Sequence, residues 1–302
     1  MTQTIRHRGR HVFDAVSSGR YEGGGLDNTP FGDHFYVDPT NGSSGNPGKS
    51  KGAAKATLAQ ALALCTDWKG DVIHVARGTQ TVTATIDVSK KGVTIIADDL
   101  MAEGSNGEYH AILADAAFTD GPVMTITQPC NIIGLGFAGR DTGATFWSGA
   151  SVLIGGLTTA LPFGVYMALC RFPKWGLDAR IGLSIEGSSN CRIEGCDFEG
   201  ALRAGIYVQG ATQHLVIKGN RFQGNTAAVL LGAFAGGGPT MILGPDNIVK
   251  GGYLLETDAN TAEGQIIGNY SDLAVGNAYD RTVTQLKAQG LDPIGNHYLE
   301  AN

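Results

Sequence analysis

Short segments that alternate apolar and polar residues recur along the chain at a nearly constant spacing. Each is four to six residues long, is rich in Ile and Val, and is followed by Gly or Asn within a few residues. These features are typical of β-strands. One series consists of GLSIEG (182–187), GIYVQG (205–210), AVLLGA (228–233) and GYLLET (252–257). Its members begin 23, 23 and 24 residues apart, which predicts coils of about 23–26 residues.

A second series runs out of phase with the first. It consists of CRIEGCDFEG (191–200), LVIKGNRFQG (215–224), MILGPDNIVKG (241–251) and QIIGNY (265–270). We expect one column of side chains from Ile193, Ile217, Ile242 and Ile266. Two or three strands in each repeat leave no room for a helix. The fold class predicted is therefore all-β, a parallel β-helix rather than a βαβ array.

The two ends differ from the repeats. Residues 1–33 are polar and irregular and are expected to form an N-terminal arm. The β-helix is expected over 34–280, with a short amphipathic helix at 54–66 that caps the open edge of the first coil. Residues 281–302 are expected to form a short helix, at 281–289, and a tail.

The segment HFYVDPTNGSSGNPGKSKGAAKATLAQALALCTDWKGDVIHVARGT (34–79) resembles the opening of pectate-lyase-like right-handed parallel β-helices. In that family, Y-V-D-P-x-N-G-S is followed by a capping helix and by a first strand of the form G-D-x-I-x-V-x-x-G. The resemblance implies a right-handed coil. It leaves the function open, because the fold carries lyases, hydrolases, epimerases and phage spikes alike.

Composition and charge exclude several function classes. The net charge is −6 and no cluster of Lys and Arg is large enough to follow a phosphate backbone, so no nucleic-acid partner is expected. The chain has no run of 18 apolar residues and no apolar core of a signal peptide in its first 20 residues, so we expect neither membrane insertion nor secretion. The five cysteines form no CxxC pair, and no metal or other cofactor is expected.

Two sets of pectinolytic motifs are missing. The lyase pattern R-x-P-x-x-R is approached at Arg171 and Pro173, but Gly176 stands where the second arginine belongs. The polygalacturonase motifs do not occur in order, and the only Asp-Asp pair, Asp98–Asp99, lies early and without partners. These absences favour a protein that is not an enzyme of either kind, and no catalytic residue is assigned.

The strongest acidic cluster has a structural interpretation. Strand alternation predicts that Phe172, Phe198 and Phe222 point inward. Their neighbours then point outward and stack as a ladder of alternating charge, which comprises Arg171, Asp197 and Arg221. A second complementary pair is expected between Glu194 and Lys218.

One outward column is expected to be apolar. Tyr207, Leu230 and Leu254 each lie between two residues assigned to the core. Apolar side chains stacked on an outer face need a cover, either a loop of the same chain or a neighbouring subunit. Because β-helices of phage spikes commonly associate side by side, we expect a homotrimer with these residues at its contacts.

The resulting hypothesis is a non-enzymatic structural component of a bacteriophage virion. It would be a capsid decoration or cement protein, or a head spike, made in the host cytoplasm. Its partners would be itself and other virion proteins, with host surface polysaccharide as a further ligand. The arm would dock through Arg6, Arg8, Arg10 and Arg20. The alternative is a tailspike or secreted enzyme that processes polysaccharide, a lyase or glycoside hydrolase on the same fold.

Overall fold

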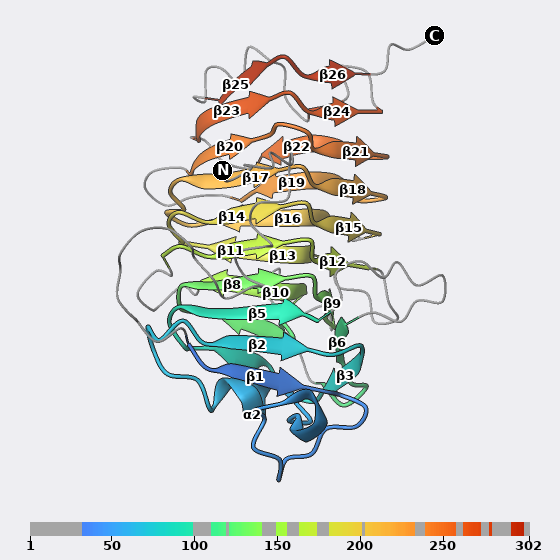
Figure 1. Cartoon of the computed structure of the whole chain (residues 1–302). Coiled ribbons are helices and arrows are strands. Elements are labelled where there is room, and N and C mark those ends of the chain that lie inside the picture. Colours follow the sequence, from blue (N-terminus) through green and yellow to red (C-terminus); the bar gives the residue numbers. More distant parts are fainter. Residues whose placement is uncertain are drawn as a thin grey trace, which may run out of the picture.

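The fold was analysed in a computed structural model. The residues that the structure describes are 32–98, 110–118, 121–140, 149–155, 163–173, 181–200, 203–232, 239–257, 262–272, 278–279 and 291–298. Three long parallel sheets wind around one core, and Figure 1 shows their strands stacked as the rungs of a single rod. This architecture confirms the predicted parallel β-helix. Within the described residues no helix is long and apolar enough to cross a membrane.

Each coil contributes one strand to each sheet in most of the rod. Sheet A has ten strands: β1 (His34–Val37), β2 (Val72–Val75), β5 (Val93–Ala97), β8 (Cys130–Ile133), β11 (Tyr166–Ala168), β14 (Arg192–Glu194), β17 (Leu215–Lys218), β20 (Thr240–Leu243), β23 (Glu263–Ile267) and β25 (Leu291–Ile294). Sheet B has nine: β3 (Gly78–Val82), β6 (His110–Ala114), β9 (Gly136–Ala138), β12 (Arg171–Phe172), β15 (Asp197–Glu199), β18 (Arg221–Gln223), β21 (Ile248–Lys250), β24 (Tyr270–Ser271) and β26 (His297–Tyr298). Sheet C has seven: β4 (Ile86–Val88), β7 (Met124–Ile126), β10 (Ala150–Gly155), β13 (Ile181–Glu186), β16 (Ala204–Gln209), β19 (Ala227–Leu231) and β22 (Tyr253–Thr257).

The N-terminal end of the rod is closed by a short helix, as the sequence predicts. The helix, α2 (Leu58–Leu62), is shorter than the expected 54–66 and is preceded by the 3₁₀ turn η1 (Lys51–Ala53). Thr57 and Gln60 form a capping box, which satisfies free backbone N–H groups at the start of the helix. Leu58 is fully buried on the side that contacts β1, β2 and β4, so the helix covers the first coil.

The core consists of inward columns of like side chains. Phe172, Phe198 and Phe222 stack with ring-centroid separations of 4.5 and 4.9 Å, and all are buried. Two other columns deviate from the predicted register. Ile217 pairs with Leu243, so Ile242 lies on the outer face and is 41% exposed. The short turn before β20 places the inward residue one position later than the spacing suggests.

The coil length of 23–26 residues holds only for part of the rod. Ile95 pairs with Ile132, 37 residues later, and Ile132 pairs with Met167, 35 residues later. The rod also continues past the expected end at 280, because β25 pairs with β23 and β26 with β24. The helix predicted at 281–289 lies outside the described residues.

Candidate functional site

The predicted charge ladder lies on the outer face of sheet B. β12, β15 and β18 are successive rungs, and their register places Asp197 between Arg171 and Arg221. Asp197 Oδ2 lies 3.9 Å from Arg171 Nε and 3.8 Å from Arg221 Nη1. The sequence placed these residues correctly because the stacked phenylalanines fix the register of all three strands.

Glu199 is a fourth member of this group. Its carboxylate oxygens lie 3.5 Å from Arg171 Nη2 and 3.7 Å from Arg221 Nη2. Two carboxylates of β15 therefore lie between arginines of the rungs on either side. All four ion pairs are at or beyond 3.5 Å and the side chains are 21–48% exposed, so each contributes little to stability.

The proton affinity of Asp197 is unusual for a residue flanked by two arginines. Burial, followed by the neighbouring Glu199 carboxylate, raises the pKa of Asp197 to about 6, and the two arginines only partly offset this increase. Among the described residues, Asp197 Oδ1 is one of few buried side-chain oxygens that have no hydrogen-bond partner. A carboxyl group of this kind can hold a proton near neutral pH, which is a property of general acids.

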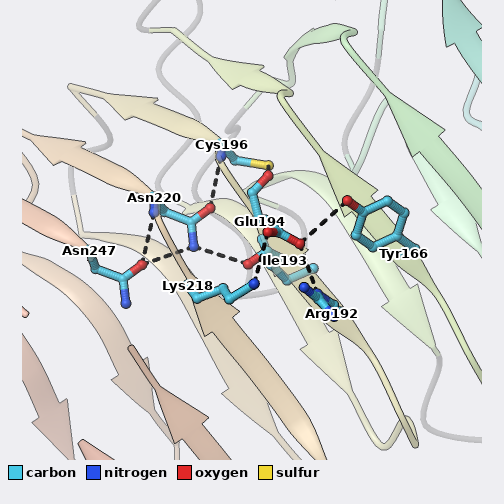
Figure 2. A network of polar contacts seen from close by, with 8 residues as sticks. All are labelled: Tyr166, Arg192, Ile193, Glu194, Cys196, Lys218, Asn220 and Asn247. Atoms are coloured by element: carbon cyan, nitrogen blue, oxygen red, sulfur yellow. Dashed lines mark hydrogen bonds and ion pairs between the residues drawn. The ribbon is translucent and has the colours of Figure 1, made fainter. Parts of the chain in front are cut away.

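A separate polar network surrounds Glu194 on the outer face of sheet A (Figure 2). Lys218, its partner on the next rung, lies 3.0 Å away, as the sequence predicts. Arg192 Nε lies 2.8 Å from the carboxylate, and the Tyr166 hydroxyl is at 3.4 Å. Burial alone would raise the pKa of Glu194, but hydrogen bonds from Lys218 and Arg192 lower it overall. Glu194 is thus an ionised structural anchor.

Figure 2 also shows a ladder of asparagine side chains that sequence reasoning missed. Asn220 accepts a hydrogen bond from the backbone N–H of Cys196 and donates to the carbonyl of Ile193. Asn247 repeats the pattern one rung later, followed by Asn269 and Asn296. The available signal was the dipeptide Gly-Asn at 219–220, 268–269 and 295–296.

The predicted apolar stripe on sheet C needs two corrections. Leu254 is not part of it, since Leu230 pairs with Glu256, and Leu254 lies fully buried in the main core. The reason is a 26-residue step from Val229 to Leu255, two longer than the sequence alignment assumed. Tyr207 and Leu230 do share the outer column but are 7% and 0% exposed within one chain. They are therefore not a surface open to a second subunit.

An ion pair contributes to covering this column. Arg203, just before β16, contacts Glu256 on β22 through both guanidinium nitrogens, across the rung formed by β19. Further along the same face, Glu186 is 3% exposed and accepts a hydrogen bond from the Ser184 hydroxyl at 3.4 Å. Burial raises the pKa of Glu186.

The remaining predicted site lies outside the described residues, namely the arm with Arg6, Arg8, Arg10 and Arg20. No group of three or more His, Cys, Asp or Glu side chains in the described part of the chain is arranged to hold a metal ion. The five cysteines are free and buried, and burial raises the pKa of Cys130 and Cys191 above that of an exposed thiol. They act as core residues.

Comparisons with known proteins agree with this geometry. Residues 169–273 match the family model of the right handed beta helix region. The chain has the pectate-lyase-like right-handed β-helix fold. A comparison with curated protein sequences finds no match.

Solved structures with the same fold are distant in sequence. Pectate lyase Pel9A is 14% identical with a TM-score of 0.55, over 91% of this chain and 79% of that one. A mannuronic acid specific polysaccharide lyase of family 6 from human gut microbiota is 12% identical with a TM-score of 0.57, over 88% of this chain and 59% of that one. ORF18 of Geobacillus virus E2 is 13% identical, over 89% of this chain and 62% of that one, but its TM-score of 0.44 is too low to carry an argument. Likeness at this identity shows the fold alone.

Proposed function

We propose that the chain is a non-enzymatic structural component of a bacteriophage virion, a capsid decoration or head-spike protein attached through its N-terminal arm. The observation that supports a structural role is the pairing of acids with bases on neighbouring rungs. Asp197 and Glu199 lie between Arg171 and Arg221, and Glu194 is held by Lys218. The acids of the strongest cluster thus have partners within the rod.

The attachment to a virion rests on the charge of the arm. Arg6, Arg8, Arg10 and Arg20 face only Asp14 and Glu22 among residues 1–25, which suits docking to an acidic protein surface. A homotrimer remains part of the proposal, but its contacts lie elsewhere than at Leu230 and Leu254 because both are fully buried in one chain.

The test is to locate the chain in purified phage particles. Mass spectrometry of particles and labelling with an antibody against this chain are expected to find it on the head surface. Replacing the four arm arginines by serine is expected to abolish incorporation and to leave the soluble β-helix folded. Particles that contain none of the chain would contradict the proposal.

A second candidate function, cleavage of polysaccharide, is favoured by one observation. Asp197, with its pKa near 6, and Glu199 form a carboxyl pair on an outer face, and paired carboxyl groups are the machinery of glycoside hydrolysis. The chain is to be incubated with pectate, alginate and host surface polysaccharide. Release of reducing ends or unsaturated products by the wild type, and not by Asp197→Asn, would establish this alternative over the first.

A further inference from the structure

Two histidines far apart in the sequence meet at the N-terminal end of the rod. His34 begins β1, the edge strand of sheet A, and His74 lies on β2. His34 Nδ1 and His74 Nε2 are 2.9 Å apart, which is a hydrogen-bond distance. The dispersed positions of the histidines in the sequence gave no sign of this contact.

A carboxylate continues the chain of contacts. Asp98, directly after β5, lies with its Oδ1 3.4 Å from His74 Nδ1, and its Oδ2 is 2.7 Å from Lys51 Nζ of η1. The ring of Tyr36 stacks on His74 with centroids 5.0 Å apart. The cluster thus ties the edge strand to the second rung, the third rung and the loop that precedes the cap.

Proton counting restricts the states in which this contact exists. A hydrogen bond between two imidazoles needs one N–H and one lone pair. A neutral pair meets this condition, and so does a pair that shares one extra proton, because His74 then donates to both Asp98 and His34. A doubly protonated pair has two N–H groups facing each other at 2.9 Å and two like charges, so the contact must break.

We propose that the His34–His74 contact is an acid-sensitive latch that holds the edge strand β1 against β2. Acidification that places a proton on both rings releases His34 and loosens β1. In the described structure β1 hydrogen-bonds to β2 alone within sheet A, so it is the strand of that sheet most easily detached at this end. The predicted arm joins the rod directly before β1, so release changes how the arm is anchored.

The charges around the latch set the direction of its response. His74 faces Asp98, which favours its protonation, and faces His34 and Lys51, which oppose it. Burial is the largest influence, and the pKa of His74 is lowered overall. The unfolded chain therefore binds the proton more readily than the folded one, and the stability that His74 contributes above its unfolded pKa is lost as the pH falls below it. Asp33 beside His34 is occupied by Lys49 and Lys69 at 3.0 and 2.7 Å.

The experiment is amide hydrogen exchange of the full chain at about pH 7.5 and about pH 5, corrected for intrinsic exchange rates. In the wild type, the protection of the β1 amides of Phe35, Tyr36 and Val37 is expected to fall roughly tenfold at the lower pH. In His34→Gln the side chain cannot ionise, and this fall is expected to disappear. His214→Gln, at an exposed histidine on a distant rung, is the matched control and is expected to behave as the wild type.

Nuclear magnetic resonance titration of the wild-type histidines provides a second readout that does not depend on a variant. Coupled rings are expected to titrate in two separated steps. Independent single-step curves for His34 and His74 would overturn the proposal. So would a fall in β1 protection that is equal in the wild type and in His34→Gln.

Discussion

The side-chain Nδ2 of Asn220 donates a hydrogen bond to Oδ1 of Asn247, 3.0 Å away on the next rung. The same Nδ2 lies 3.1 Å from the carbonyl oxygen of Ile193 on the rung before. One amide therefore links three successive coils at the sharp corner between sheets A and B, where the backbone ladder is interrupted. Backbone groups at that buried corner would otherwise lack partners.

Replacing Asn247 by alanine is expected to destabilise the fold strongly. Asn247 is fully buried, accepts from Asn220, and donates to Asn269 at 2.8 Å and to the Ile217 carbonyl at 2.9 Å. Several buried groups would lose their partners, at a cost of roughly 3 kcal/mol. Denaturant unfolding measures the change. Asn41→Ala, at an exposed asparagine bonded only locally to Asp38, is expected to change stability by less than about 0.5 kcal/mol.

Cys196 occupies the position in its coil that Asn220 occupies in the next. Its Sγ lies 3.8 Å from the carbonyl of Met167, the counterpart of the Ile193 carbonyl, and both residues follow a glycine with φ near 60°. Cys196→Asn is therefore expected to extend the ladder by one rung and to hold or raise the melting temperature. Cys130→Asn, a buried cysteine outside this column, is the control and is expected to lower it. Equal losses in both variants would refute the equivalence.

The stability contribution of Asp197 is expected to depend on pH in a direction opposite to that of an ordinary ion pair. Because its folded pKa is raised to about 6, the stability that the protonated form contributes is present below pH ~4 and is lost as the pH rises through 6. Asp197→Asn should therefore gain on the wild type, by on the order of 2 kcal/mol, between pH ~4 and pH ~7. Unfolding of both proteins across this range measures the difference. A constant difference would show that the arginines neutralise Asp197 after all.

Leu230→Glu is expected to destabilise the protein rather than to dissociate an oligomer. Leu230 is fully buried beneath its own chain, so the variant buries a charge without a partner. Ile242→Glu, at an outer position that is 41% exposed, is the matched control and is expected to remain folded. Circular dichroism with light scattering distinguishes unfolding from dissociation. A folded monomeric Leu230→Glu variant derived from a trimeric wild type would restore the interface hypothesis.

The fold was predictable because one signal is repeated many times. Regular spacing of Phe172, Phe198 and Phe222 was enough to fix the register of three strands and the ladder of charges beside them. Where coils differ in length, spacing misleads, as it did at Ile242 and Leu254, since a step of one or two residues changes which side chain faces inward.

The clusters that sequence reasoning missed have no local pattern. His34, His74 and Asp98 are separated by 40 and 24 residues and meet only because the coils between them stack. The raised pKa of Asp197 was also beyond reach, because it depends on burial and on the exact distances to two arginines. Such properties follow from placement in three dimensions rather than from residue type.

The ion pair between Arg203 and Glu256 has a consequence for how the rod comes apart. In a repeat protein each coil normally touches only the coils beside it, and the ends can fray one coil at a time. Arg203 and Glu256 belong to coils that are separated by the rung of β19, so the pair couples second neighbours. Opening the rung of β22 therefore costs a contact of β16 as well. Fraying from the C-terminal end is expected to pause there, and the coils from β16 to β22 to melt as one cooperative unit.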